Sequence, residues 1–426
     1  MKRSAVLGLT IAALAAWGCV PESGGGDDDP IVIDPGQDPE PDPGMEPDPD
    51  PGMEPEPDPD PEPGMEPEPD PDPDPQRDGL AVLGYQGHGP GSVDITVIAT
   101  DRDGLAVPRD LDFNHDAETP ELWIVNRWDD STTTIFEPGT PQQESIHLID
   151  PFALHFMEEV SSIAFGAPGT FGTCQESRNT YNGQAERNDF MGPSLWPSDL
   201  NIYARTNPDA VAFLGFDLGS HLDMQHESPL CMGMAWDKAN VYWIFEGLTN
   251  SIARNDFGED HGPGFDDHSD GIVTRFGVGE VSRVPDVPSH LVFDQDTGLL
   301  YIADTGNARV AVLDTFSGEL GPPMPVVEPG TVLRMATDYE PIATVFQNPE
   351  LQLPSGLAKQ GDVLFVGDNA NGRIWGISAS TGEVLDYLDT GIEEGGLMGL
   401  EIGPEGNLWV VDAWTHRVLR ISPLAD

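Results

Sequence analysis

The sequence predicts an all-β protein, a six-bladed β-propeller that follows a signal peptide and a disordered, acidic, proline-rich linker. Three observations predict it. An eleven-residue frame recurs along the body of the chain. Short β-rich runs alternate with Gly, Pro and Asp, without a long amphipathic helix. A proline–acid repeat precedes this body, so we expect a signal peptide at 1–18, a lipidated cysteine and linker at 19–77, and the propeller at 78–426.

The N-terminus has the pattern of an export signal. A basic pair at positions 2 and 3 precedes an uncharged run up to Trp17, too short to remain as a transmembrane helix. Gly18 and Cys19 follow, and this resembles a bacterial lipobox, which implies lipidation of Cys19. Trp17 departs from that pattern, and a cleaved signal peptide with an unrelated cysteine is the alternative. Because Val20 rather than Asp follows the cysteine, the resemblance implies anchoring to the outer membrane.

The linker contains acid–proline units along residues 27–75, with 20 acidic residues and no Lys or Arg. Proline removes the amide donor and fixes φ, so neither a helix nor a strand ladder is expected there. An extended polyproline II segment of about 45 residues would reach on the order of 140 Å. We interpret it as a spacer that holds the propeller away from the membrane.

The charge of the chain restricts its partners. The formal net charge is −56, and residues 78–426 alone hold 54 acidic against 16 basic residues. Long-range repulsion disfavours nucleic acid and anionic lipid headgroups, so contact with a membrane is expected only through the lipid anchor. Divalent cations and basic ligands are favoured, although solubility alone is the simpler explanation of the charge.

Two cysteines remain if Cys19 carries lipid. In an oxidising compartment Cys174 and Cys231 are expected to pair as a disulfide, with two buried thiols as the alternative.

The recurring frame is clearest near the C-terminus. It reads LYIADTGNARV from Leu300, LFVGDNANGRI from Leu364 and LWVVDAWTHRV from Leu408, with looser copies at Leu122 and Tyr242. Each copy places an aromatic residue three positions before a polar one, and Phe171 marks a degenerate sixth copy; the other aromatics are Trp123, Trp243, Tyr301, Phe365 and Trp409. The Asp and Arg of the frame recur from copy to copy, which indicates turn or inter-blade contacts rather than catalysis.

A second, six-residue piece precedes each copy. It reads PRDLDF from Pro108, VSSIAF from Val160, CMGMAW from Cys231, PSHLVF from Pro288, PSGLAK from Pro354 and LMGLEI from Leu397. The six copies predict six blades, in which this piece forms the innermost strand, the aromatic frame forms the next strand and an Arg-led strand follows. One such blade cannot bury its own faces, so the blades must stack in a ring.

This pattern resembles the NHL repeat. The three C-terminal copies match it well over residues 287–423, and the first three blades rest on register. Ring closure predicts that Val93–Ala99, near the N-terminus, forms the outer strand of the last blade.

Three regions are candidates for a functional site. Propellers bind ligands at the mouth of the channel, where the innermost strands begin, and the candidates there are Arg109, Asp110, Ser162, His290 and Ser355. Peptidyl-hydroxyglycine lyases, which have similar repeats, place a zinc-binding histidine directly after the proline of this piece. Here Arg109, Ser289 and Ser355 stand at that position, and His290 falls one place later. His155 and His226, shortly before blades 2 and 3, could contribute, but their spacing is not that of the family, which disfavours a three-histidine zinc site.

The second candidate is the acidic loop 256–270, where Ca²⁺ or Zn²⁺ could bind; its potential ligands are Asp260, His261, Asp266, Asp267, His268 and Asp270. A solvated acidic loop is the competing interpretation. The third candidate is a long insertion at residues 175–201 that could form a recognition surface, with Arg178, Tyr181, Arg187 and Trp196 as its candidates. A packed cap, with Trp196 in a local core, is equally compatible with this sequence.

No GxSxG elbow, P-loop or HExxH motif is present, which disfavours catalysis. The sequence therefore favours a lipid-anchored, non-catalytic binding module for a protein, peptide or glycan. The alternative is a metal-dependent propeller enzyme, lyase-like or lactonase-like, with its ion in the central channel. A structural surface-layer component is a third hypothesis, because the fold is compatible with each of them.

Overall fold

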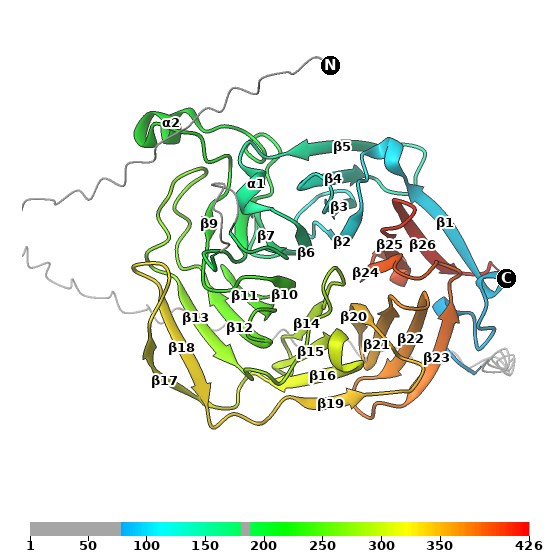
Figure 1. The fold of residues 1–426 in the computed structure, drawn as a ribbon. Helices are drawn as coiled ribbons and strands as arrows, with labels where there is room; N and C mark the ends of the chain where they lie inside the picture. The colour runs from blue at the N-terminus through cyan, green and yellow to red at the C-terminus, as the bar shows by residue number, and fades with distance from the viewer. Residues whose placement is uncertain (1–77, 180–187, 426) are drawn as a thin grey trace, which may run out of the picture. The chain divides into compact units, whose positions relative to one another are not determined.

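A computed structural model describes residues 78–179 and 188–425, which form a ring of six β-sheets around a central channel (Figure 1). The predicted signal peptide 1–18, the linker 19–77 and the predicted lipidation site Cys19 lie outside the described residues. Tyr181 and Arg187 of the insertion lie outside them as well. None of the described helices is long and apolar enough to cross a bilayer.

In blades 1 to 5 the first four strands follow one another in chain order from the innermost strand outwards (Figure 1). Blade 1 contains β2 (Pro108–Phe113), β3 (Glu121–Asn126), β4 (Ser131–Phe136) and β5 (Glu144–Ile149). Blade 2 contains β6 (Val160–Phe165), β7 (Thr170–Gln175), β8 (Ser194–Pro197) and β9 (Asp223–Met224). Helix α1 (Ala153–Phe156) precedes this blade in the chain, and α2 (Pro208–Leu214) lies between β8 and β9. Blade 3 begins with β10 (Cys231–Lys238), β11 (Val241–Glu246), β12 (Ser251–Asp256) and β13 (Ile272–Phe276).

The second half of the ring repeats this order. Blade 4 contains β14 (Leu291–Asp294), β15 (Leu299–Asp304), β16 (Arg309–Asp314) and β19 (Ala343–Phe346). Blade 5 contains β20 (Pro354–Gln360), β21 (Val363–Asp368), β22 (Arg373–Ser378) and β23 (Val384–Asp389). Blade 6 contains β24 (Leu397–Ile402), β25 (Leu408–Asp412), β26 (Arg417–Pro423) and β1 (Val93–Ala99). Short 3-10 turns occur at Ala81–Leu83, Pro90–Ser92, Asp101–Asp103, Thr305–Asn307 and Pro404–Gly406.

The ring closes through its two ends, as the sequence predicted. Strand β1 pairs antiparallel with β26, from Val93 opposite Pro423 to Val97 opposite Leu419. The last blade therefore contains strands from both ends of the described chain. This pairing ties blade 6 to the segment that leads into blade 1.

The repeated pieces take the positions expected of them. In every blade the six-residue piece forms or leads into the innermost strand, and the aromatic frame forms the second strand. The frame aromatics are at most 4% exposed. Several of them contact the aromatic residue that ends the piece of the next blade: Trp123 on Phe165, Trp243 on Phe293 and Trp409 on Phe113. The blades thus bury each other's faces, as the repeat pattern requires.

The Asp and Arg residues of the frame have structural contacts. Arg309 donates to Asp304 at 2.7 Å, whereas Arg373 pairs with Glu350 and Asp389. Asp368 instead accepts the backbone N–H groups of Gln352 and Leu353. Turn stabilisation is therefore the common role of these carboxylates in the described chain.

One feature of the ring lies beyond the repeat pattern. A hairpin formed by β17 (Glu319–Met324) and β18 (Val332–Thr337) interrupts blade 4, yet it belongs to the sheet of blade 3 (Figure 1). Strand β18 runs parallel to β13, from Val332 opposite Ile272 to Met335 opposite Arg275. The hairpin covers the edge that β13 would otherwise expose, and blade 3 becomes a six-stranded sheet.

Candidate functional site

The third and fifth residues of the six-residue piece face the innermost strand of the next blade. Side chains alternate along a strand, so these two positions share one side. Small residues occupy them in most blades, and this lets adjacent strands approach closely: a Cβ on Gly233 would lie 2.0 Å from the Ser289 carbonyl oxygen, and one on Gly356 2.6 Å from that of Met398. The exceptions with acidic or imidazole side chains are Asp110 and Asp112 in blade 1, His290 in blade 4 and Glu401 in blade 6.

These four residues line one cavity. It has a volume of about 360 Å³ and is bounded by residues of all six innermost strands. We call this cavity, with Asp110, Asp112, His290 and Glu401, the channel site. It lies along the innermost strands from the third residue of the six-residue piece onwards, whereas the sequence predicted a site where these strands begin.

Asp110 is the centre of the hydrogen bonding in the channel site. Its Oδ2 accepts hydrogen bonds from the Ser162 hydroxyl at 2.7 Å and from the Ile163 N–H at 3.0 Å, both in blade 2. The Nε2 atom of His290, from blade 4, lies 3.4 Å from the same oxygen. Three of the five predicted rim residues, from three blades, therefore lie together.

Asp112 and Glu401 add two carboxyl groups to this site. Asp112 accepts the N–H of Phe165 at 2.7 Å, and Glu401 accepts only the N–H of its own neighbour Ile402 at 2.9 Å among the hydrogen bonds of the described chain. No Lys or Arg of the described residues forms an ion pair with Asp110, Asp112 or Glu401. Three acidic groups thus face one cavity in which His290 is the one basic side chain among the described residues.

Burial raises the pKa of all three carboxyl groups. The pKa of Asp112 is raised to about 7, first by burial and then by the charge of Asp110. Burial and the charge of Asp112 raise the pKa of Glu401 well above its usual range. The pKa of Asp110 is raised by burial, although His290 and its hydrogen-bond donors oppose this. Loss of water and mutual repulsion both favour the protonated forms, so a cation in the cavity would compete with protons.

His290 gives the site its one imidazole. The residue is 4% exposed, and its Nε2 atom lies near Asp110 and 3.5 Å from the Ser161 carbonyl oxygen. Its Nδ1 atom is buried without a hydrogen-bond partner in the described part of the chain. A buried nitrogen of this kind is available to a bound ligand.

Ser162 and His290 do not form a serine–histidine pair in the described residues. The Ser162 hydroxyl donates to Asp110, and its hydrogen bonds do not include His290. In serine–histidine catalysis the hydroxyl donates to the imidazole. The geometry instead is that of a polar pocket with fixed acceptors.

Arg109 and Ser355 lie elsewhere. Arg109 borders a second cavity, of about 430 Å³, near the beginning of the innermost strands, where its guanidinium donates to the Asp286 carbonyl oxygen. Burial and the neighbouring Arg127 lower the pKa of Arg109 to about 10. Ser355 is fully buried, and its hydroxyl donates to the Met398 carbonyl oxygen at 3.2 Å. The backbone of Ser355 accepts the N–H of His290 at 3.1 Å, so Ser355 positions that histidine.

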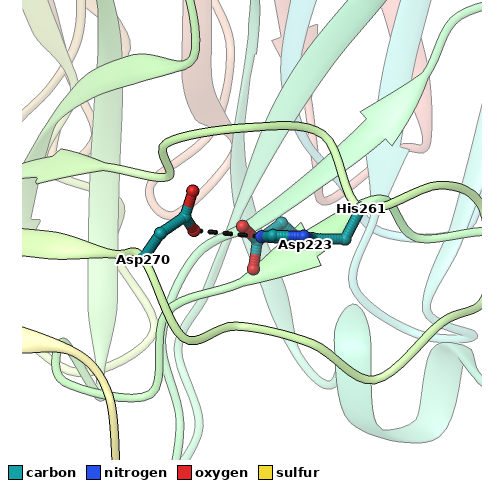
Figure 2. Close-up of side chains that lie close together, drawn as sticks. All are labelled: Asp223, His261 and Asp270. Carbon is teal, nitrogen blue, oxygen red and sulfur yellow. Dashed lines mark hydrogen bonds and ion pairs between the residues drawn. The ribbon is translucent and has the colours of Figure 1, made fainter. Parts of the chain in front are cut away.

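The six ligands predicted in the acidic loop do not converge on one point. The Nε2 atom of His261 donates to Asp270 at 3.0 Å, and both residues lie beside Asp223 of blade 2, which completes a group of three potential ligand atoms within 4.8 Å of one another (Figure 2). His268 is buried and lies 2.7 Å from Asp223, whereas Asp266 is exposed and lies 3.4 Å from His268. The other two accept local backbone N–H groups: Asp260 from Gly262, and Asp267 from Ser269.

The insertion does not expose Trp196 to solvent, so of the two interpretations of this residue the packed cap is correct and the recognition surface is wrong. Trp196 lies in β8 with an exposed fraction of 0%, and its indole N–H donates to the Thr173 hydroxyl at 2.8 Å. It packs among the core aromatics of blade 2, including Phe171 and Tyr203. Burial of the large apolar surface of the indole ring stabilises the folded protein, which is why Trp196 lies in the core and not on the surface. Arg178 pairs with Asp189 within the same insertion, at 2.5 Å.

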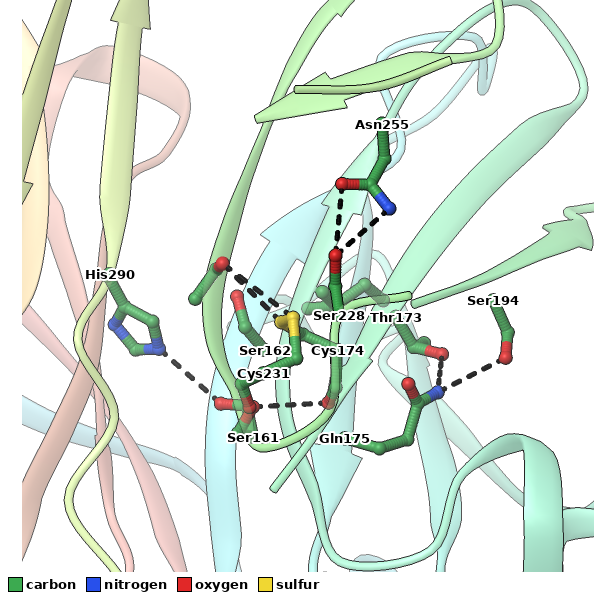
Figure 3. Close-up of a disulfide and its surroundings, with 12 residues drawn as sticks. Ser161, Ser162, Thr173, Cys174, Gln175, Ser194, Ser228, Cys231, Asn255 and His290 are labelled. Carbon is green, nitrogen blue, oxygen red and sulfur yellow. Dashed lines mark hydrogen bonds between the residues drawn. A yellow bond between two sulfur atoms is a disulfide. The ribbon is translucent and has the colours of Figure 1, made fainter. Parts of the chain in front are cut away.

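Cys174 and Cys231 form a disulfide across a sequence separation of 57 residues (Figure 3). The bond joins β7 of blade 2 to β10 of blade 3 beside the channel. Ser161 donates to the carbonyl oxygen of Cys231 at 2.7 Å and to that of Cys174 at 3.1 Å, and its own carbonyl faces His290 (Figure 3). The disulfide therefore fixes the strands that carry the backbone around His290.

Sequence reasoning missed Asp112, Glu401 and Asp223. A signal for the first two was present, since both stand at the fifth position of the six-residue piece, where the other blades have Ala or Val. Asp223 had no such signal, because its approach to the acidic loop depends on how blades 2 and 3 pack.

No protein-family model matches the chain. No curated protein matches it either. Several solved structures are similar to it: a luciferin-regenerating enzyme at 16% identity and a TM-score of 0.46, covering 78% of this chain and 96% of that one; a streptogramin B lyase at 10% identity and 0.42, covering 78% and 97%; and regucalcin, a calcium-binding protein from Agrobacterium tumefaciens, at 10% identity and 0.45, covering 77% and 96%. At these identities the likeness extends to the propeller fold alone.

Proposed function

We propose that the protein is an exported lipoprotein whose propeller is a non-catalytic binding module, and that the channel site takes a cationic group of a protein or peptide partner. The observation that carries this proposal is the set of three carboxyl groups, Asp110, Asp112 and Glu401, that line one cavity without a described Lys or Arg partner. Each has a pKa raised by burial. A bound ammonium or guanidinium group would stabilise their ionised forms.

Charge on the whole propeller supports the same class of partner. Residues 78–426 hold 54 acidic and 16 basic residues, so a basic peptide is attracted at long range. A neutral glycan would gain nothing from this field. A peptide with a lysine or arginine that enters the cavity therefore fits better than a glycan.

A metal-dependent enzyme with its ion in the channel is the second candidate, because His290 and the three carboxyl groups are metal-ligand types. Catalytic zinc sites usually have three protein ligands, but among the described residues the ligand atoms of the channel site include no three within 4.8 Å of one another.

The cellular setting is part of the proposal. Cys19, with the export signal before it, supports lipid anchoring, and the acidic linker supports display of the propeller away from the outer membrane. A disulfide between Cys174 and Cys231 fits an oxidising compartment. The NHL-like repeats fit a propeller of this kind. Cys19→Ala should release the protein from the membrane fraction and prevent incorporation of labelled palmitate; a variant that is still membrane-bound would contradict the anchor.

The binding site is tested with the full-length protein and a synthetic lysine-rich peptide, compared with the same peptide acetylated on its lysines. Calorimetry should show binding of the unmodified peptide only, and Asp112→Asn with Glu401→Gln should weaken it at least tenfold. A double variant with the same change of charge on the surface, Asp209→Asn with Glu340→Gln, should retain the affinity, because both residues are exposed outside the channel.

Equal loss in the two double variants would contradict the channel site and indicate attraction by the acidic surface as a whole. No peptide binding, together with uptake of Ca²⁺ that Asp112→Asn abolishes, would instead favour the metal-dependent candidate.

A further inference from the structure

Five of the histidines gather between blades 2 and 3, at residues that the proposed channel site does not use. They come from separate segments of the chain: α1, the stretch around β9, and the loop between β12 and β13. The five are His155, His221, His226, His261 and His268. Four of them are buried. Burial of several imidazoles together is unfavourable unless each nitrogen has a partner or a ligand.

Two of these imidazoles point ring nitrogens at each other. The Nε2 atom of His155 lies 3.3 Å from the Nε2 atom of His226, and the two residues are 4% and 2% exposed. Two nitrogen ligands on a tetrahedral zinc ion, each at about 2.0–2.1 Å, stand roughly 3.3–3.4 Å apart. The pair therefore already has the spacing of two ligands on one ion.

The tautomer and the ring position of His226 are set by its neighbours. Its Nδ1 atom lies 3.0 Å from a carboxylate oxygen of Glu328, which the hairpin of blade 4 brings over blade 3. A proton on Nδ1 leaves the lone pair of Nε2 directed at His155. Phe190 stacks on the ring of His226, with 3.8 Å between centroids. A carboxylate on the outer nitrogen of a histidine is the usual support of a metal ligand.

Both imidazoles are held in the neutral form that binds metals. Both side chains are buried, and loss of water disfavours the charged form of an imidazole. The carboxylate of Glu328, which contacts His226, would offset part of the charge of the ion, and the nearby His268 is paired with Asp223 and Asp266.

We propose that His155 and His226 bind a divalent transition-metal ion of the zinc type through their Nε2 atoms, with Glu328 as the residue that orients His226. Water or a ligand of the ion fills its remaining positions. Imidazole nitrogen is a poor ligand for Ca²⁺, which prefers oxygen, so Ca²⁺ should not compete. The site is separate from the channel site, and either proposal can fail without the other.

The nearby group of Asp223, His261 and Asp270 is the competing location. Its ligand atoms also converge, but His261 is already paired with Asp270 at 3.0 Å, and Asp270 is exposed. An ion there would have to replace an existing ion pair. The two locations share no residue, so separate variants distinguish them.

The test uses full-length protein from which metal has been removed with EDTA. Titration with Co²⁺ should give visible absorption bands of a nitrogen-ligated ion that saturate at about one equivalent, and Zn²⁺ should displace the Co²⁺ whereas Ca²⁺ should not. His155→Gln and His226→Gln should abolish the bands. Glu328→Gln should weaken Zn²⁺ binding about 10- to 100-fold. His261→Gln, the matched control in the same region, should bind as the wild-type protein does.

Three results would overturn the proposal. Wild-type protein that binds no Co²⁺ or Zn²⁺ would mean that the two imidazoles are joined by a hydrogen bond only. Loss of binding in His261→Gln, with binding kept in His226→Gln, would place the ion at the competing group. Zn²⁺ affinity unchanged in Glu328→Gln would remove the orienting role. Circular dichroism of each metal-free variant checks its fold, and Glu328→Gln keeps the test decisive if a histidine variant does not fold.

Discussion

Blades 5 and 6 and blades 2 and 3 are adjacent pairs in the same ring, but they are held together differently. In blades 5 and 6 the chain passes from strand to strand through short turns, and each blade shows the repeat clearly. In blades 2 and 3 the chain makes long excursions between strands, and the pair also acquires a disulfide and the hairpin of blade 4.

The difference shows where sequence is constrained by packing. Gly356 of blade 5 has no room for a side chain, since a Cβ would lie 2.6 Å from the Met398 carbonyl oxygen and 2.7 Å from the Leu400 side chain. Contacts of this kind keep the repeat regular. Between blades 2 and 3, a covalent bond and inserted segments add to the repeated contacts. It is there that the buried histidines gather, in segments outside the repeat.

Removal of the disulfide between blades 2 and 3 should change the stability of the protein more than any other variant proposed for this comparison. Cys174→Ser with Cys231→Ser opens a covalent loop of 57 residues, and we expect the free energy of unfolding to fall by about 3–4 kcal/mol. Urea denaturation under oxidising conditions measures it. Wild-type protein reduced with dithiothreitol should unfold at the same urea concentration as the double variant. An unchanged midpoint would mean that the inserted segments alone hold the two blades together.

Gly356→Ala tests the regular pair. The added methyl group has to displace backbone of blade 6, so we expect a loss of about 1–3 kcal/mol in the free energy of unfolding. Gly89→Ala is the control, because a Cβ there would meet nothing within 4 Å. If the two variants were equally stable in urea, close approach of strands would not be what maintains the repeat.

Asp112→Asn should stabilise the protein at neutral pH, because blades 1 and 6 bring its carboxyl group close to that of Glu401. The pKa of Asp112 is about 7 in the folded protein, and near 3.9 in an unfolded chain. The folded state therefore binds the extra proton, and wild-type stability falls as pH rises from about 4 to 7. The variant avoids this loss, so its advantage should be near zero at pH 4 and about 1–3 kcal/mol at pH 8.

Thermal denaturation at the two pH values measures this effect. Asp209→Asn, a change at an exposed site, should show no such pH dependence. If Asp112→Asn were less stable than wild type at pH 8, ionisation of Asp112 near Glu401 would not be what lowers the stability of the protein.

The smallest expected changes in the free energy of unfolding come from two surface ion pairs, one in each pair of blades. Arg373 of blade 5 pairs with Asp389 at 2.6 Å and lies over the ring of Tyr387 at 4.2 Å, so Arg373→Ala should cost about 1 kcal/mol. Arg178 in the insertion of blade 2 pairs with Asp189, and we expect Arg178→Ala to cost about 0.5 kcal/mol or less. Urea denaturation in low salt compares them. A larger loss for Arg178→Ala would show that its insertion contributes more to stability than the repeat does.

The candidate site could be predicted from the sequence only in part. Asp110, Ser162 and His290 were found because the six-residue piece recurs and marks the innermost strands. Asp112 and Glu401 occupy a position whose importance appears only when adjacent strands are packed. Trp196 was open to two interpretations, and burial in the core of blade 2 decided between them.

The sequence by itself determined the number of blades, the order of their strands and the closure of the ring by Val93–Ala99. These follow from the alternation of β-rich runs with turn residues and from the two repeated pieces, which are patterns along the chain itself. Only the tertiary structure decided that β18 joins blade 3, that three carboxyl groups share the channel, and that His155 meets His226. Each of these brings together segments far apart in the chain, and such contacts depend on how whole blades pack rather than on any pattern along the sequence.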